Sequence, residues 1–259
     1  MFYPCGIHFL VSQLVAYAAV YVLTLLGDGI DAFQRQVVFL TGLSGLLSMA
    51  PCLYFYKKDQ NARLAGGLLS RTFRKKLGPG EAVLVFFMGI AFSQFVNLLV
   101  ALFQNVLNYQ QYQESMEQIT YGKDLLTLVF WMGVIAPLAE EVIFRWLIYL
   151  RLRDYMRMGA AVVISGVFFG IYHMNLVQAV YAGILGMLFA YFMEITGSLW
   201  TSVLLHMGTN IWSLVFSAAA PWILEKDPVW ILYLYVFLLF IMIAGILYFQ
   251  KRAGKANAA

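Results

Sequence analysis

The stretch Pro137-Leu-Ala-Glu140-Glu141-Val-Ile-Phe-Arg145 places two carboxylates and a guanidinium inside an otherwise apolar run. The flanking residues 125–130 and 146–150 are mostly apolar. A charge at the centre of a bilayer costs at least about 2.5–3.5 kcal/mol, so ionisable residues within a membrane span usually belong to a functional site. The stretch therefore predicts an intramembrane site whose partners lie elsewhere in the chain.

The composition is that of a polytopic membrane protein. Of the 259 residues, 62% are hydrophobic and only 12% are charged, which lies outside the usual range of soluble domains. The net charge of +4 would indicate nucleic acid only if the basic residues clustered on a soluble domain, and no soluble stretch is long enough to form one. We therefore expect one transmembrane domain over residues 1–259, embedded in the lipid bilayer and without a nucleic-acid partner.

Apolar runs of about 20 residues, the length needed to cross a bilayer, predict the architecture. Eight runs are found, of which the fifth is short: residues 8–26, 36–56, 82–107, 124–150, 159–173, 176–193, 199–220 and 229–249. The first run has no basic leader or cleavage-like motif, so we expect it to remain as a helix. Residues 108–122, rich in Gln and Tyr, are expected to form a polar loop. The predicted fold class is an all-α polytopic integral membrane protein with about eight transmembrane helices enclosing a polar intramembrane cavity.

The basic residues predict the topology, because loops rich in Lys and Arg face the cytoplasm. The loop 57–80 has one acidic residue, Asp59, and these basic residues: Lys57, Lys58, Arg63, Arg71, Arg74, Lys75 and Lys76. By alternation, the basic segments 151–157 and 251–255 lie on the same side. Both termini are therefore expected in the cytoplasm, in the cell membrane of a prokaryote. Cys5 and Cys52 would lie near a reducing compartment and are expected to be free thiols.

Helical geometry divides the charged stretch. On an α-helix Glu141 and Arg145, four residues apart, share a face, whereas Glu140 is turned by about 100°. An ion pair between Glu141 and Arg145 would offset the cost of burying either charge. This leaves Glu140 as the candidate general base. Pro137 has no N–H for the Gly133 carbonyl, so we expect a kink and a free backbone acceptor there.

Later helices supply further polar groups. His173 closes Phe169-Gly-Ile-Tyr-His173, and His206 and Asn210 lie four residues apart on one helix face. Two intramembrane imidazoles beside a carboxylate pair favour a shared site over separate packing roles. At about 1.5 Å per residue, His206 lies roughly 10 Å and His173 roughly 20 Å from the cytoplasmic ends of their helices, so we expect a polar cavity that enters from that side. Close helix packing is predicted for Gly166, Gly170, Gly183 and Gly186.

Three motifs in this order resemble the CPBP family, the CAAX proteases and bacteriocin-processing enzymes also called Abi proteins. The motifs are E-E-x-x-x-R (Glu140, Glu141, Arg145), F-x-x-x-H (Phe169, His173) and H-x-x-x-N (His206, Asn210). They lie in a core of about residues 120–215. The resemblance implies an intramembrane glutamic endopeptidase that needs no cofactor and acts on a membrane-associated protein or peptide.

The resemblance also implies roles for the motif residues. Glu140 and His173 would activate the water that attacks the scissile carbonyl, because a carboxylate and an imidazole can deprotonate water. His206 and Asn210 would stabilise the oxyanion with N–H donors, worth about 2.7–4 kcal/mol each. The residues that shape the site would be Glu141, Arg145 and Phe169.

Three other interpretations remain open. A zinc-dependent membrane protease could use His173, His206 and a glutamate as ligands, although no H-E-x-x-H motif is present. Gly42-Leu-Ser44-Gly45 matches the G-x-S-G of rhomboid serine proteases, although such runs of small residues usually pack helices. A non-catalytic membrane scaffold or immunity-type protein would bind a partner through the basic loop and keep the polar cluster for fold specificity.

Overall fold

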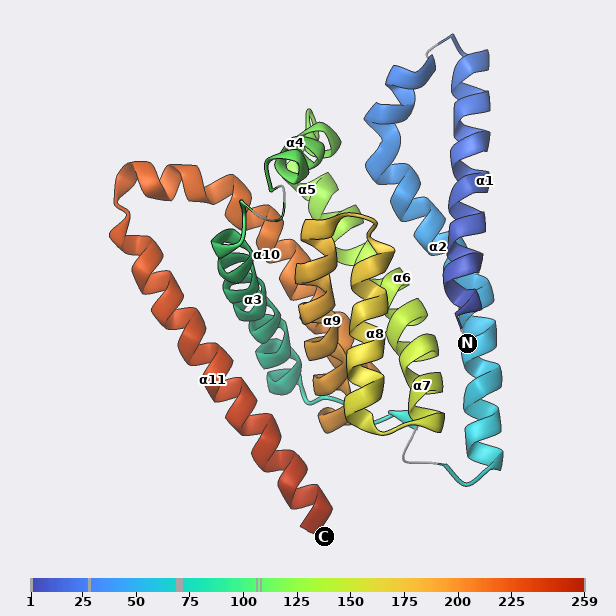
Figure 1. The fold of residues 1–259 in the computed structure, drawn as a ribbon, viewed down its shortest axis with the longest axis vertical. Helices are drawn as coiled ribbons and strands as arrows, with labels where there is room; N and C mark the ends of the chain where they lie inside the picture. The colour runs from blue at the N-terminus through green and yellow to red at the C-terminus, as the bar shows by residue number, and fades with distance from the viewer. Residues whose placement is uncertain (1, 28, 69–71, 106, 108, 259) are drawn as a thin grey trace.

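The chain folds into a bundle of helices, shown in Figure 1 as a computed structural model. The described residues are 2–27, 29–68, 72–105, 107 and 109–258, and they contain no β-strand apart from one isolated bridge. Among these described residues, seven helices are long and apolar enough to cross a membrane, and one apolar helix is shorter. This confirms the all-α polytopic membrane fold. The elements outside the charged helix are α1 (Tyr3–Leu25), α2 (Gly29–Ala65), α3 (Pro79–Leu102), α4 (Tyr109–Thr120), α8 (Met158–Tyr172), α9 (Leu176–Thr196), α10 (Leu199–Lys226) and α11 (Val229–Ala258).

The charged stretch lies in one continuous helix that changes its hydrogen-bond register. Its segments are α5 (Leu125–Leu128), the π-helical η2 (Val129–Ile135), α6 (Ala136–Glu141), the π-helical η3 (Val142–Tyr149) and α7 (Leu150–Tyr155). In a π-helical segment an N–H bonds the carbonyl five residues back, and such segments occur frequently at functional sites. Glu140 and Glu141 close the short α6 between the two π-helical segments.

Two regions expected as loops are partly helical. α2 continues past residue 56 to Ala65, and its end is held by an ion pair from Arg63 to Asp154 at 2.8 Å. The third span ends at Leu102, and the expected loop 108–122 contains α4. Tyr112 of α4 packs against a hydrophobic cluster that includes Val100 of α3 and Val177 of α9, and burial raises the pKa of Tyr112 to about 12. The few apolar side chains of α4 lie on one face. α4 is therefore an amphipathic helix that packs on the bundle through this face.

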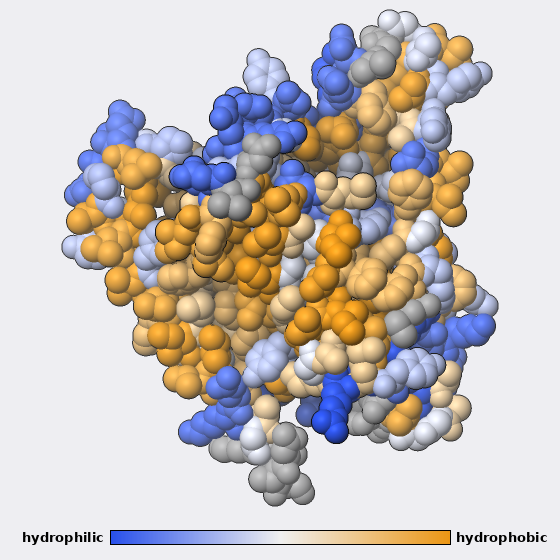
Figure 2. All heavy atoms as spheres, in the orientation of Figure 1, coloured by the Kyte–Doolittle hydropathy of each residue, from blue (hydrophilic) through white to orange (hydrophobic). Residues whose placement is uncertain are grey.

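The basic segments lie toward one end of the bundle. Figure 1 places the end of α11 at this end and the start of α1 nearer the middle, where Tyr3 contacts Arg151. Arg151 lies over the ring of Tyr3, with its guanidinium carbon 4.4 Å from the ring centroid. Arg252 of α11 pairs with Glu81 at the start of α3. Figure 2 shows a broad hydrophobic band with hydrophilic residues toward its two ends. The arrangement agrees with basic segments on one side of a membrane, and the placement of both termini in the cytoplasm stays a prediction. Cys5 and Cys52 are free thiols, as expected.

A close contact between α3 and α10 sets the register of α10. Gly89 of α3 lies against the Leu205 carbonyl of α10, where an added Cβ would overlap the backbone. Thr209 of α10 donates a hydrogen bond of 3.1 Å to the Gly89 carbonyl. Because α10 carries His206 and Asn210, these contacts also set the depth of both side chains.

The Gly42-Leu-Ser44-Gly45 segment packs α2 against the charged helix. Gly42 lies against the ring of Trp131, and a Cβ on Gly45 would lie 3.1 Å from that of Ala139. Ser44 is buried and accepts a hydrogen bond of 3.1 Å from Ser12 of α1. These contacts are those of a helix-packing surface, so nothing in them favours the serine-protease interpretation.

Candidate active site

Glu141 and Arg145 form the buried ion pair that the sequence predicted. Arg145 Nη1 lies 3.1 Å from Glu141 Oε1, and both side chains are fully buried. The guanidinium carbon of Arg145 lies 4.2 Å from the centroid of the Phe169 ring. Within the described structure its nitrogens have no hydrogen-bond partner. The ion pair and the cation–π contact are therefore the interactions that stabilise this buried charge.

Glu140 is the accessible carboxylate of the two. Its side chain is 24% exposed, whereas that of Glu141 is 0% exposed. Glu140 Oε2 lies 3.6 Å from His206 Nε2. A general base that acts on water must be reached by water. The difference in exposure thus separates the two carboxylates in the way that helical geometry predicted.

His206 lies between the two carboxylates. Its Nδ1 is 2.9 Å from Glu141 Oε1, and because a carboxylate accepts, Nδ1 carries a proton. Nε2 faces Glu140 and can donate to an oxyanion only when the ring holds both protons. The His206 ring is stacked on Phe189, with centroids 5.0 Å apart and planes inclined by 28°. Its edge-on contact with Phe169 has a centroid separation of 5.5 Å.

Asn210 pairs with a backbone carbonyl that Pro137 leaves free, but not with the one predicted. The expected acceptor was Gly133, four residues before Pro137. η2 has a register of five residues, as in the bond from the Ala136 N–H to the Trp131 carbonyl. The carbonyl that loses its partner is then Met132, since Pro137 has no N–H. Asn210 Nδ2 donates to Met132 O at 2.9 Å, and its second N–H remains available.

His173 approaches the site from the other side of Phe169. The His173 ring centroid lies 4.8 Å from that of Phe169, which also contacts His206. The Phe169 ring thus contacts both imidazoles, although the sequence places them at different depths. His173 Nδ1 donates to the Phe169 carbonyl at 2.8 Å, so Nε2 carries the lone pair that a general base needs. In the described structure the hydrogen bond of His173 is with Phe169, and none joins it to Glu140.

A strained turn follows His173. Met174 has a φ of +55°, in the left-handed region that residues other than glycine rarely adopt. Asn175 then caps α9, its side chain accepting from the Gln178 N–H at 3.2 Å. Such backbone strain is concentrated at functional sites. The turn ends α8 after 15 residues and leaves His173 at its C-terminus.

The first helix also contacts the edge of the site, through a residue outside the motifs. His8 is hydrogen-bonded to the Tyr172 hydroxyl. Tyr172 packs against Phe144 with ring centroids 5.2 Å apart. A histidine in an apolar run was the available signal in the sequence. Its partner could not be predicted, because the contact joins residues 164 positions apart.

The predicted polar cavity stays a prediction. A hollow of about 720 Å³ is lined by Arg63 and Asp154 at the basic end, and one of about 360 Å³ by Glu114 and Glu117 of α4. Neither hollow is lined by Glu140. Across the residues that the structure describes, no group of three or more His, Cys, Asp or Glu side chains is placed to hold a metal ion.

The comparison with protein families points to the same region of the chain. Residues 122–212 match the sequence model of the family described as type II CAAX prenyl endopeptidase, Rce1-like. The match contains all three motifs, from Glu140 to Asn210. No curated protein and no solved structure matches the chain. The central region, residues 122–212, is therefore similar to the Rce1-like family, which confirms the resemblance that the three motifs indicated.

Proposed function

We propose that this protein is an intramembrane endopeptidase of the glutamic type, which hydrolyses a peptide bond of a membrane-associated protein or peptide. The observation that carries the proposal is the pairing of a partly exposed Glu140 with His206, beside a fully buried ion pair, in an apolar helix. A charged cluster in a membrane span is retained for function. The region that contains it matches a family of endopeptidases.

The chemistry follows from the protons that each group can move. Glu140, with His173 Nε2, takes a proton from water as the water oxygen attacks the scissile carbonyl. The oxyanion accepts hydrogen bonds from the free N–H of Asn210 and from Nε2–H of doubly protonated His206. When the intermediate collapses, the C–N bond breaks, and the proton held by the base passes to the leaving amine. Glu141 and Arg145 hold His206 in place.

The first test is the Glu140→Gln variant, reconstituted in liposomes. We expect the rate of cleavage to fall by about 10²–10⁴-fold, because a general base contributes a factor of that size. Cleavage is followed by mass spectrometry on a prenylated CAAX peptide and on membrane peptides of cells with active or inactive protein. The amide keeps the shape of the carboxylate, so the unfolding temperature should change little. Full biological effect from Glu140→Gln and His173→Ala would favour the scaffold interpretation instead.

Metal dependence has a separate test. The glutamate mechanism predicts that activity survives treatment with a strong chelator. Activity that disappears on chelation and returns with Zn²⁺ would replace this mechanism by the zinc alternative, in which His173, His206 and a glutamate are ligands.

A further inference from the structure

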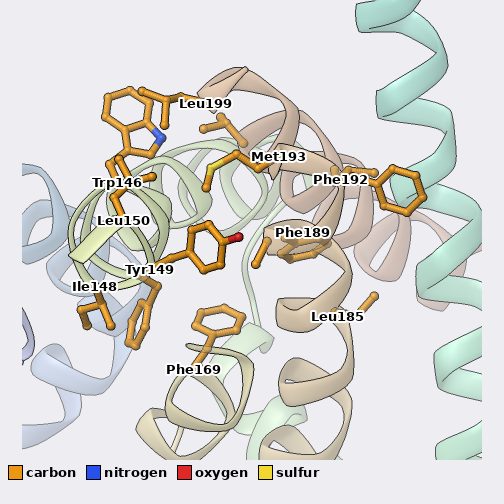
Figure 3. Packing of buried hydrophobic residues seen from close by; sticks show 14 of the residues in the cluster. Trp146, Ile148, Tyr149, Leu150, Phe169, Leu185, Phe189, Phe192, Met193 and Leu199 are labelled. Atoms are coloured by element: carbon orange, nitrogen blue, oxygen red, sulfur yellow. The ribbon is translucent and has the colours of Figure 1, made fainter. Parts of the chain in front are cut away.

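The Arg145 guanidinium is enclosed by residues of α9 that belong to none of the three motifs. Besides Phe169, it faces Phe189, whose ring centroid lies 5.4 Å from the guanidinium carbon. It also faces Gly186, one turn earlier on α9. Phe189 is 1% exposed. Figure 3 shows the rings of Phe169 and Phe189, from α8 and α9, turned toward the same interior region beside Tyr149.

Gly186 is the glycine of the α8–α9 contact whose nearest neighbours are side chains of the site. A Cβ on Gly186 would lie 2.7 Å from Arg145 Nη2, 2.9 Å from Phe169 Cδ1 and 3.3 Å from the backbone Cα of Gly166. A Cβ on Gly183, in the same helix, would meet nothing nearer than the Gly166 carbonyl oxygen at 3.6 Å. Gly170, in contrast, lies directly against the Ala179 backbone carbonyl. Gly186 therefore leaves room for a side chain, whereas Gly170 leaves room for a helix.

Phe189 contacts two site residues with one ring. It stacks on His206 and also lies beside the Arg145 guanidinium. Arg145 in turn holds Glu141, and Glu141 Oε1 accepts from His206 Nδ1 at 2.9 Å. These contacts form a closed ring of interactions. They fix the plane of the imidazole and direct Nε2 toward Glu140.

We propose that Gly186 and Phe189 are positioning residues of the site. Gly186 provides the space that Arg145 occupies, and Phe189 holds Arg145 and His206 in their mutual orientation. Neither residue contacts the reacting atoms, so both act on catalysis through the two side chains they hold. The effect on catalysis rests on the proposed function, whereas the effect on Arg145 does not.

The catalytic part is tested with reconstituted protein and a prenylated CAAX peptide. Gly186→Ala should lower kcat on the order of 10–100-fold with little change in KM, since a misplacement of about 1 Å can cost about 100-fold. Gly183→Ala is the matched control and should retain the wild-type kcat. Phe189→Leu should lower kcat, whereas Phe189→Tyr, which keeps the aromatic ring, should retain most of the wild-type kcat. A normal kcat in Gly186→Ala, or an equal loss in Gly183→Ala, would overturn the proposal.

The structural part is tested without any peptidase assay. Thermal unfolding is measured for Gly186→Ala in the wild type and in a Glu141→Gln/Arg145→Ala background, which lacks the guanidinium and its counter-charge. The destabilisation by Gly186→Ala should be clearly smaller in that background, where the overlap with the guanidinium is gone and those with Phe169 and Gly166 remain. The destabilisation by Gly170→Ala, which affects only helix packing, should persist in both backgrounds. Equal destabilisation by Gly186→Ala in both backgrounds would show that Gly186 merely packs helices. If the wild-type protein cleaves neither the prenylated CAAX peptide nor any membrane peptide of the cells, the proposed function fails, and this cycle still decides the role of Gly186.

Discussion

Arg145 is a fully buried charge of the site, and its stabilisation depends on few partners. Its ion pair with Glu141 spans 3.1 Å, and both side chains are fully buried. Removing one partner of a buried pair leaves an uncompensated charge and costs about 3–5 kcal/mol. We therefore expect Arg145→Met to lower the free energy of unfolding by about that amount. Thermal or denaturant unfolding in detergent measures the change.

The double variant Glu141→Gln/Arg145→Met is the control for this prediction. It removes both charges, and replacing a whole buried pair by uncharged groups is often nearly neutral. We expect it to recover much of the stability that Arg145→Met loses. Equal losses in the single and double variants would mean that packing, rather than charge, accounts for the effect.

The charged helix is the element whose backbone takes part in the site. Its π-helical register leaves the Met132 carbonyl to Asn210, because the residue five positions later is Pro137. We expect Asn210→Ala to cost about 1–3 kcal/mol, the penalty for an unsatisfied buried acceptor. In a Pro137→Ala background a new N–H can reach Met132, so the same change should cost less. Unfolding measurements on the wild type, the two single variants and the double variant give the coupling free energy between Asn210 and Pro137. Strictly additive losses of stability would contradict the prediction.

The start of the same helix predicts a dependence on pH. Asp124 accepts hydrogen bonds from the Thr127 N–H at 2.9 Å and the Thr127 hydroxyl at 2.7 Å. These bonds hold the pKa of Asp124 below its ordinary value. Their contribution to stability is complete above the ordinary aspartate pKa of about 3.9 and is lost as the pH falls through the lower pKa of the folded state. The protection factor of the Thr127 amide against hydrogen exchange, which corrects for the intrinsic pH dependence, should fall over that range.

Asp124→Asn is the matched control for the pH dependence. Asparagine caps helices about as well as aspartate but does not titrate. In the Asp124→Asn variant, the protection factor of the Thr127 amide should therefore not change as the pH falls through this range. A fall of the same size in Asp124→Asn would assign the pH dependence to another group.

At the scale of the whole molecule, the gathering of basic segments at one end predicts the topology. We expect single cysteines at Lys58 and Arg157, placed in a Cys5→Ser/Cys52→Ala background, to react with a membrane-impermeant thiol reagent only after cells are permeabilised. Cysteines at Gln113 of α4 and at Asp227, before α11, should react in intact cells. Labelling of Lys58→Cys from outside would reverse the orientation. Labelling of Lys58→Cys and Arg157→Cys on opposite sides would contradict the fold.

Much of the architecture was determined locally and could be predicted. A run of apolar residues long enough to span a bilayer must form a helix, because no water is present to satisfy its backbone. The ion pair of Glu141 with Arg145 was equally predictable, since four residues on one helix place the two groups on one face. α4 was missed because its polar composition resembles that of a loop, and its packing on Val177 is a long-range contact.

Within the site, the sequence by itself determined which residue types gather, and the tertiary structure decided how they are joined. The motifs supplied the carboxylates, the imidazoles and the amide. The apolar pattern of the charged helix did not reveal its π-helical register, which moved the free acceptor from Gly133 to Met132, and the amide that binds this acceptor comes from α10. The stacking partner of His206 and the space that Gly186 leaves for Arg145 come from α9. That an apolar segment forms a helix is encoded by neighbouring residues. Contacts between helices depend on the depth and rotation at which each helix packs, which no local pattern specifies.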